Sequence, residues 1–568
     1  LLARAPPPTD PASRARLESV RASLASAGAL LGAGRYQEGE AQARLQVAAA
    51  RELGYAPVLA EALELHGRLQ EKAGDPVAAE STLEEAELTA EASRDDALAT
   101  RASAQLADLL LRQSELARGQ SWLRHGEASL QRSGGDDALR ARLLEVRSRA
   151  LATAGDHAGA VRLMLSALEL KERAYGRDHL EVAASLDLLA RALKEPDQRP
   201  RALELARRAL RVVEAALGPN HPDVADALAA VGQVHRDMEQ FQQELDCARR
   251  ALAIRERALG PDHLAVAAAR WNLGTALHNL GDMEGALEQF RAALAAFERA
   301  YGPDHVRVAT LRGNIAGLQV ELGDDQQALA AWQRILAAYE RAFGHDRPQN
   351  IHALRGVALA LGMRRRFAEA DAYLERTFAA ARILSPENPD LFFAYSDQAE
   401  LLRLEGRFSQ ARAAEERAIQ LLGKMSPEPS LAVAAQQISL ARLLCAEGKP
   451  EQALAVAQPA RAALEAGFGA DHRLVADALA VEGEAARATG NASRAVELLE
   501  RAVRLRDKWR YRPELEAESR FSLARALGLD ASQRARAREL AAAAREDFTR
   551  SGDRQRAAAA SAWIAEHP

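Results

Sequence analysis

The tripeptide His235-Arg236-Asp237 is the first feature of the sequence that could carry chemistry. In phosphoryl transfer, an Asp in such a tripeptide accepts the proton of the attacking hydroxyl group, and an Asn five positions later holds a metal ion. The later position is Gln242 here, no Asp-Phe-Gly tripeptide follows, and no glycine-rich loop precedes. Because a motif needs its structural context, we interpret the tripeptide as a chance match near the end of a helix.

Histidines in register could suggest a metal site, since one recurs every 42 residues at His179, His221, His263 and His305. Zinc needs its nitrogen ligands at about 2.0–2.1 Å from one point, whereas copies on successive repeats lie about one helix pair apart. Asp or Asn precedes each histidine, and these residue types cap helices. We therefore predict no metal site, and a capping and loop-packing role for these histidines and for Asp178, Asp262 and Asp304.

Adjacent acidic residues could form an acid–base pair, as at Glu84-Glu85, Asp95-Asp96 and Glu415-Glu416. All three pairs fall on helical stretches or turns, and we interpret them as solvated faces. The sequence contains no phosphate-binding Walker loop, no Gly-x-Ser-x-Gly elbow and no Cys-x-x-Cys pair. We therefore expect that the chain is not an enzyme and that it uses no cofactor.

The elements that would have to position any site are helices. The chain has 568 residues, which exceeds the roughly 250–300 residues that one core can serve. It is 48% hydrophobic but only 4% aromatic, and its dominant apolar residue is alanine, which favours closely packed helices over sheets. The chain is therefore either several domains or one array of helical repeats.

The charge balance narrows the choice of partner and compartment. The 75 basic and 80 acidic residues give a formal charge of −5, which provides no basic field for a nucleic acid. Only Cys247 and Cys445 are present, which is typical of a reducing compartment. No apolar run is long enough to span a membrane. We expect a cytoplasmic location, with no membrane contact from this segment.

Glycines mark an internal repeat. An interval of 42 residues separates Gly176, Gly218, Gly260, Gly302 and Gly344. A second break lies inside each repeat, at Gly155-Asp156, Gly281-Asp282, Gly323-Asp324, Gly406-Arg407, Gly448-Lys449 and Gly490-Asn491. Between breaks the apolar residues recur at steps of three and four, which predicts two amphipathic helices per repeat.

Small residues occupy one position in each of these helices. In the first helix they are Gly232, Gly274, Ala316, Ala358, Ala399, Ala441 and Gly483. In the second helix they are Ala160, Ala202, Ala286, Ala328, Ala370, Ala411, Ala453 and Ala495. Small side chains let helix axes approach to the lower end of the range of about 8–10 Å, so we expect helices to cross at these positions.

The segment Asn272-Leu273-Gly274, the break Gly281-Asp282 and the spacing of Ala286 and Phe290 resemble the tetratricopeptide signature. The 42-residue length and the Gly-Pro-Asp-His phrase are most similar to the longer repeats of kinesin light chains and their bacterial relatives. The resemblance implies an all-α fold, a right-handed superhelical solenoid of about twelve to thirteen helical hairpins. We predict a Pro-rich linker over 1–13, N-terminal repeats over 14–135, regular repeats over 136–511, and a final repeat with a capping helix over 512–568.

The two ends together carry a narrower resemblance. The Pro-rich start, Gly34-Arg35-Tyr36 and the tail that ends at Trp563-Ile-Ala-Glu-His-Pro568 are similar to the C-terminal sensor regions of large bacterial serine/threonine protein kinases. In that family the kinase domain, and usually a membrane helix, comes first. The chain starts at Leu1 rather than at methionine, so we expect it to be part of a longer protein. The resemblance implies a place within that protein, with a kinase domain in the same polypeptide as an alternative partner.

A stacked array of hairpins curves, and its first helices line the concave side, where a peptide or protein segment can bind. Asn272 and Asn314 resemble the residues that clamp peptide backbones in related repeats, and Trp271 is either an apolar anchor or a packing residue. The predicted groove consists of Arg191, Gln233, Arg236, Trp271, Asn272, Thr275, His278, Asn314, His352, Arg355, Asp397, Glu400 and Arg403. We therefore expect a scaffold or sensor that binds a protein or peptide partner.

Overall fold

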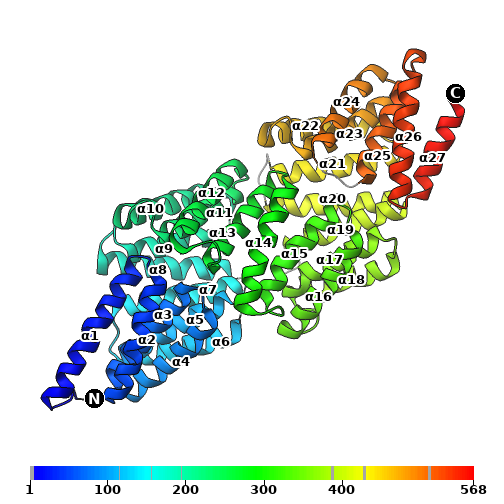
Figure 1. Ribbon diagram of the computed structural model, residues 1–568. Helices are drawn as coiled ribbons and strands as arrows, with labels where there is room; N and C mark the ends of the chain where they lie inside the picture. The colour runs from blue at the N-terminus through cyan, green and yellow to red at the C-terminus, as the bar shows by residue number, and fades with distance from the viewer. Residues whose placement is uncertain are drawn as a thin grey trace. The chain divides into compact units, whose positions relative to one another are not determined.

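The computed structural model describes residues 6–113, 115–154, 156–193, 195–384, 389–425, 430–509 and 513–567. Within these ranges all regular structure is helical, so the prediction of an all-α repeat fold is confirmed (Figure 1). The chain divides into two compact units: Leu1–Ala276 with Arg291–Val308 is unit 1, and Leu277–Phe290 with Ala309–Pro568 is unit 2. The predicted break residue Gly155 lies outside the described ranges.

Unit 1 is built from helices of 13 to 22 residues. Those that lie wholly within it are α1 (Pro11–Gly32), α2 (Tyr36–Leu53), α3 (Ala56–Ala73), α4 (Pro76–Ala92), α5 (Asp96–Arg112), α6 (Leu116–Arg132), α7 (Asp137–Thr153), α8 (His157–Tyr175), α9 (Leu180–Ala192), α10 (Arg199–Leu217), α11 (Pro222–Asp237) and α12 (Phe241–Leu259). Three helices contribute to both units: α13 (Leu264–Asn279), α14 (Met283–Tyr301) and α15 (Val306–Glu321).

Unit 2 continues the same pattern. Its own helices are α16 (Asp325–Phe343), α17 (Ile351–Met363), α18 (Phe367–Leu384), α19 (Pro389–Glu405), α20 (Phe408–Met425), α21 (Leu431–Ala446), α22 (Pro450–Phe468), α23 (Arg473–Ala488), α24 (Ala492–Lys508), α25 (Pro513–Leu527), α26 (Arg534–Arg550) and α27 (Arg554–Glu566). Short 3-10 turns lie at Pro196–Gln198, Pro348–Asn350 and Ala531–Gln533. The described helices thus follow one another as thirteen pairs and a closing helix, α27, where the sequence predicts a capping helix.

Each odd-numbered helix is the first helix of a hairpin and each even-numbered helix is the second. Within a unit, the two helices of a hairpin pack together, and the second packs on the first helix of the next hairpin. Neighbouring first helices also touch, as α5 touches α7 and α17 touches α19. Contact between first helices places them on the inner side of the curve, as the sequence predicts.

The columns of small residues lie in the core. Ala316, Ala358 and Ala441 are fully buried in first helices, and Ala286 and Ala453 are fully buried in second helices. Glu244 interrupts the second column and is nevertheless buried, within 3.4 Å of Arg236. These small residues therefore belong to the packed core, and that the helices cross at them stays a prediction.

The glycines of the 42-residue period have an unusual backbone conformation. Gly218 has φ 84° and ψ 157°, and Gly260 has φ 81° and ψ 159°. This region of φ and ψ is essentially restricted to glycine. A glycine that follows a helix commonly adopts the left-handed conformation, but here ψ lies far outside that region, because the chain leaves the helix in an extended direction.

The histidines of the repeated phrase are themselves the N-caps. Nδ1 of His221 accepts a hydrogen bond from the backbone N–H of Asp223 at 3.2 Å, and His179, His263, His305 and His472 make the same bond two residues ahead. The predicted capping role is correct, but the cap is the histidine and not the Asp or Asn before it. Asp262 instead pairs with Arg299 at 3.0 Å.

The N-terminus also differs from the prediction. Helix α1 begins at Pro11, inside the segment 1–13 that we predict to be a linker. The side chain of Asp10 accepts a hydrogen bond from the backbone N–H of Ser13 at 2.7 Å, and Pro11 occupies the first helical position. Proline is favourable at that position because its missing N–H would be unpaired in any case.

Candidate functional site

The inner face of unit 1 carries a network of paired charges. Asp108 on α5 forms an ion pair with Arg149 on α7 at 2.8 Å and lies 3.3 Å from Arg112 and 3.4 Å from Arg142. Arg112 also pairs with Glu71 on α3. Burial alone would raise the pKa of Asp108, but the charges of Arg112, Arg149 and Arg142 outweigh it and hold the pKa below its usual range. The network links three consecutive first helices.

Arg191 on α9 continues this network toward α11. Its guanidinium pairs with Asp187 at 3.0 Å and donates to Gln233 Oε1 at 3.1 Å. Burial raises the pKa of Asp187 in spite of this pairing. Two predicted groove residues from neighbouring repeats, Arg191 and Gln233, are therefore brought into direct contact.

The remaining predicted residues of unit 1 lie apart from this pair. Arg236 turns to Glu244 at 3.4 Å, and Thr275 donates to the backbone carbonyl of Trp271 at 3.1 Å. The Trp271 ring is half-buried and packs edge-on against Phe297 of α14, with 5.7 Å between centroids. Asn272 is exposed. Trp271 thus packs within its own hairpin.

Unit 2 holds the densest group of predicted residues. Arg355 on α17 makes a bidentate pair with Asp397 on α19, at 2.5 and 3.0 Å. On the same helix, Glu400 and Arg403 form a second bidentate pair, with both distances 2.7 Å. Bidentate pairs fix the planes of both groups. His352, one turn before Arg355, packs edge-on against Trp332 with 4.9 Å between centroids.

His278 and Asn314 are the other predicted residues of unit 2. His278 Nε2 lies 3.1 Å from Glu321, which also pairs with Arg473 at 2.5 Å. Burial would raise the pKa of Glu321, but its hydrogen bond from His278 and the charge of Arg473 lower the pKa to about 2. Asn314 is half-buried on α15.

Sequence reasoning missed Phe393 on α19. Its ring is 43% exposed and lies under the guanidinium of Arg355, 4.5 Å from ring centroid to Cζ. It precedes Glu400 by seven residues, two helical turns, so both lie on one face of α19. That seven-residue spacing from a predicted groove residue is the signal that could have found it.

Glu415 corrects the interpretation of adjacent acids as solvated. It is 2% exposed on α20, and its Oε1 has no hydrogen-bond partner. Burial and the nearby charges of Glu400 and Asp397 raise the pKa of Glu415 to about 8. Asp95 is also buried, because its side chain caps α5 through the backbone N–H of Leu98. Glu415 thus lies on a buried helix face, and Asp95 is a buried N-cap.

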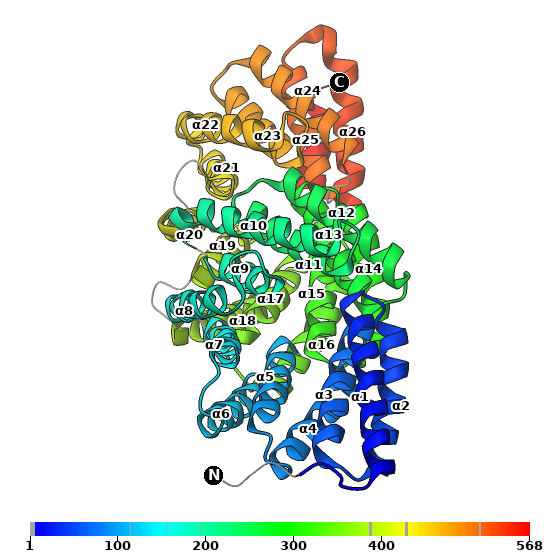
Figure 2. The ribbon, with the colours of Figure 1, turned by 90° about the vertical axis from the view of Figure 1, so that its left-hand side faces the viewer.

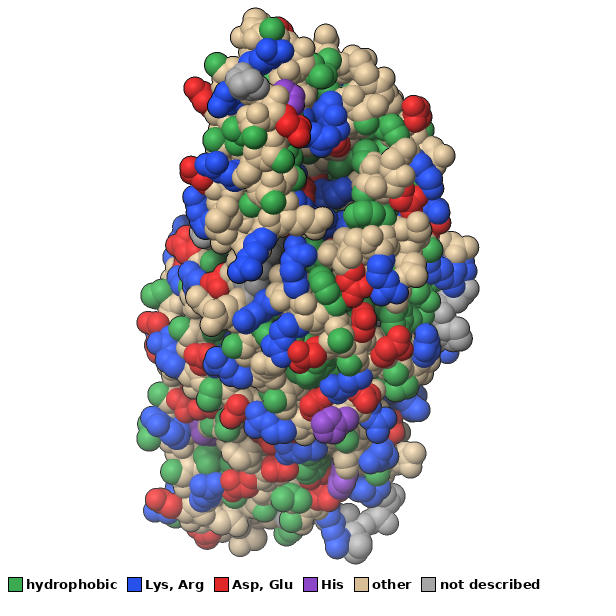
Figure 3. All heavy atoms as spheres, turned by 90° about the vertical axis from the view of Figure 1, so that its right-hand side faces the viewer, with side chains coloured by type: hydrophobic (Ala, Val, Ile, Leu, Met, Phe, Trp, Pro, Cys, Tyr) green, Lys and Arg blue, Asp and Glu red, His purple; other side chains and the backbone are tan. Residues whose placement is uncertain are grey.

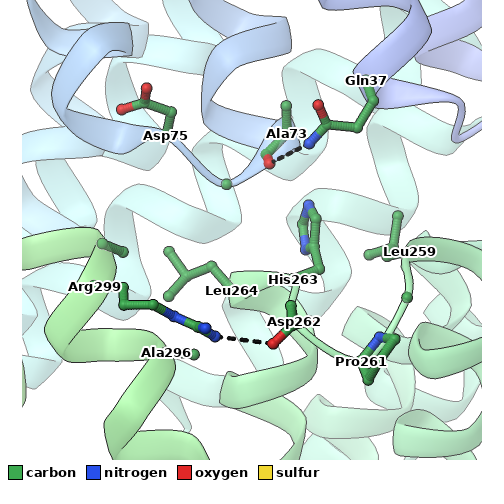
Figure 4. A pocket seen from close by; sticks show the side chains of 13 residues that line it. Gln37, Ala73, Asp75, Leu259, Pro261, Asp262, His263, Leu264, Ala296 and Arg299 are labelled. Carbon is green, nitrogen blue, oxygen red and sulfur yellow. Dashed lines mark hydrogen bonds and ion pairs between the residues drawn. The ribbon is translucent and has the colours of Figure 1, made fainter.

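One pocket of unit 1 is a different kind of site (Figure 4). It has a volume of about 630 Å³ and lies between the α3–α4 turn and the loop before α13. Asp262 and Arg299 pair with each other in it, and Gln37 donates to the carbonyl of Ala73 at 3.0 Å. Its polar side chains thus serve neighbouring elements, which is typical of a packing gap.

The tripeptide His235-Arg236-Asp237 has a structural role in α11. His235 Nδ1 lies 2.6 Å from Gln240 Oε1, and the tripeptide ends at Asp237, the last residue of α11. Among the described residues, no group of three His, Cys, Asp or Glu side chains could hold a metal ion. No helix in the described part of the chain combines the length and the apolar character needed to cross a bilayer.

The fold and the inner face define a helical-repeat scaffold whose charged surface is fixed by ion pairs. The chain belongs to the tetratricopeptide repeat family, whose sequence model matches residues 147–215, 197–257, 245–299, 265–341, 308–383 and 433–508. No curated protein sequence matches the chain.

Two solved structures show the range of similarity. One contains TPR-like repeats assigned to a kinesin light chain of Podosopora anserina; it is 19% identical over 37% of this chain and 98% of that chain, with a TM-score of 0.30. The other is a Rap protein complexed with competence and sporulation factor; it is 16% identical over 72% of this chain and 99% of that chain, with a TM-score of 0.46. At these identities the similarity concerns the helical fold alone.

Proposed function

We propose that the chain is a non-catalytic scaffold or sensor that binds a peptide or protein segment along the inner face of its first helices. The observation that carries this proposal is the pairing of Arg355 with Asp397 beside the exposed ring of Phe393. Polar groups held in fixed orientations beside an apolar contact are what an extended ligand needs for both orientation and affinity. Other tetratricopeptide repeats bind protein segments, and this supports the proposed function.

The charges of this face favour a partner that is polar but not strongly charged. Arg355, Arg403, Asp397 and Glu400 occur as two acidic and two basic groups, each engaged with its opposite. On the face drawn in Figure 3, side chains of both signs are interspersed with hydrophobic ones. We therefore propose a protein partner and no nucleic acid. Separately, we propose a cytoplasmic location, because the chain has only two cysteines.

The test begins with peptides selected from a random phage-displayed library on the purified full chain. Their affinities should fall on Arg403→Ala, which changes the inner face of α19, and stay unchanged on Glu288→Ala, which changes an exposed position of α14. A typical interface hot spot costs about 2 kcal/mol or more on truncation, roughly a thirtyfold loss of affinity. Peptides that lose affinity on Glu288→Ala but not on Arg403→Ala would place binding elsewhere.

A second function, regulation of a kinase domain in the same polypeptide, rests on the resemblance of the two ends. Residues such as Gly34, Tyr36 and Trp563 carry that resemblance. The discriminating observation is the reading frame upstream of Leu1. Kinase motifs in it would support this function, and their absence would remove it.

A further inference from the structure

Within each unit, segments almost 190 residues apart come into contact. In unit 1, His221 Nε2 lies 3.2 Å from the carbonyl oxygen of Gly32, and the hydroxyl of Tyr36 donates to Asp223 at 3.2 Å. Figure 2 shows the backbone of the helices that carry these residues. These contacts join the turn between α1 and α2 to the start of α11. The joined elements belong to the first hairpin and to the sixth, so the superhelix has completed about one turn between them.

Unit 2 makes the equivalent contact. The turn between α13 and α14 meets the start of α23, again five hairpins later. Arg473 donates to Glu321 Oε2 at 2.5 Å and to Met283 Sδ at 3.9 Å. A second contact, from Arg365 to Asp553 at 3.4 Å, joins the α17–α18 turn to the N-cap of α27. We call these turn-to-turn contacts seams.

Apart from the contact of Arg365 with Asp553, the seams combine a glycine with a histidine of the repeated phrase. A Cβ added at Gly34 would lie 3.2 Å from His221 Nε2, and one added at Gly281 would lie 3.2 Å from His472 Nε2. At Gly74 the corresponding distance to His263 is 3.5 Å. A glycine break of one repeat therefore contacts a repeated histidine one superhelical turn away. The small glycine makes room for the imidazole.

The seams are weaker than the contacts between hairpins. Ion pairs in the seams are partly exposed, with Arg473 and Glu321 side chains 19% and 35% accessible. Because these side chains keep some contact with water, salt screens the attraction between them. Contacts between hairpins, in contrast, bury whole rows of alanine and leucine side chains, as in the cluster around Leu464 and Leu479. Elements held by few buried contacts open first.

We propose that the seam at Arg473 in unit 2 is a releasable clasp: it holds successive superhelical turns together and opens while the helices stay folded. Its opening would widen lateral access to the inner face, and that consequence rests on the proposed function. The clasp itself does not depend on any ligand. Arg473 is its central residue, since it bridges α23, the start of α14 and the end of α15.

The test measures the distance between two spin labels in the full chain. Cys247 and Cys445 are first replaced by serine and alanine, and labels are attached to Glu284→Cys and Ala470→Cys, two exposed positions beside the seam. With the clasp closed, we expect one narrow distance distribution at low salt. Arg473→Gln should raise the population of longer distances several-fold while the circular dichroism spectrum stays constant. Adding 1 M salt to the labelled chain that keeps Arg473 should have the same effect.

The matched control is Arg494→Gln, which removes an arginine from an exposed ion pair with Glu497 on α24. This variant should keep the narrow distribution. Identical distributions for Arg473→Gln and Arg494→Gln, together with no response to salt, would overturn the proposal. If Arg473→Gln fails to fold, the salt series alone decides between the two results. Because no ligand is present, a failed clasp leaves the proposal of peptide binding intact.

Discussion

At the scale of single residues, Trp332 shows how a second helix can dictate glycine in its neighbours. Its indole is 3% exposed on α16 and lies against Gly313 of α15 and Gly356 of α17. A Cβ at Gly356 would lie 2.1 Å from the indole, much closer than any real contact. Glycine inside a helix weakens it, and at these two positions it leaves the space that the indole fills.

We expect Gly356→Ala to destabilise the chain by about 1–3 kcal/mol, because the indole has to move out of a packed slot. Gly317→Ala is the matched control: it also lies within a helix, but a Cβ there meets nothing within 4 Å. That variant should be neutral or stabilising by up to about 1 kcal/mol. Urea unfolding measures the stability of both variants. Equal losses in the free energy of unfolding at the two sites would contradict the claim that the indole fills the space at Gly356.

The buried carboxyl of Glu415 predicts a pH dependence. Its pKa is raised from 4.5 to about 8 in the folded chain. Below about pH 4.5 the group is protonated in both states, and it does not affect stability. As the pH rises toward 8 the unfolded chain releases the proton and the folded chain keeps it, so stability is lost across this window.

We expect Glu415→Gln to stabilise the chain by roughly 1–3 kcal/mol at pH 8 and to have little effect at pH 4. The measurement is the free energy of unfolding at several pH values. Glu416→Gln, at the exposed neighbouring position, is the control and should not change the profile. A profile that Glu415→Gln leaves unchanged would mean that the carboxyl is ionised in the folded chain.

At the scale of elements, the positions of the small residues determine how helices cross. Ala316 is fully buried on α15, whereas Gln326 at the start of α16 is exposed. We expect Ala316→Leu to cost about 1–3 kcal/mol through overpacking, and Gln326→Leu to cost much less. Thermal or urea unfolding of the two variants distinguishes them. Equal effects would show that the helical phase is wrong.

The elements were largely predictable because their signals are local. Breaks such as Gly281-Asp282 and the apolar spacing between them mark both helices of a hairpin within a few residues. The start of α1 was misplaced because Asp10 and Pro11 form a cap signal inside a Pro-rich segment. The partners of the histidines were not predictable. His221 in the sixth hairpin contacts Gly32 in the first, and no local sequence pattern indicates such a contact.

The candidate site was predictable only in part, for the same reason. The spacing along the sequence places Asp397, Glu400 and Arg403 on one helix, α19. All three belong to the two bidentate ion pairs of the candidate site. Which groups pair, however, depends on neighbouring helices. Trp271 was open between anchor and packing residue, and its contact with Phe297 shows that it packs within its hairpin. The exposed aromatic beside the charges is Phe393 instead.

At the scale of the whole molecule, a helical-repeat scaffold has an inner and an outer surface. We propose that the inner surface binds the partner. Phe393 on first helix α19 and Ile383 at the end of second helix α18 offer a matched pair of positions in unit 2. They are 43% and 59% exposed, and both are hydrophobic. Only the first lies on the inner face beside Arg355.

The most direct test places the photoreactive residue benzoylphenylalanine at one of these positions in the full chain and irradiates it with a peptide selected for binding. We expect covalent peptide capture from position 393 and little from position 383, with capture competed away by unlabelled peptide. Specific capture from position 383 with none from position 393 would contradict the claim that the inner face binds the partner.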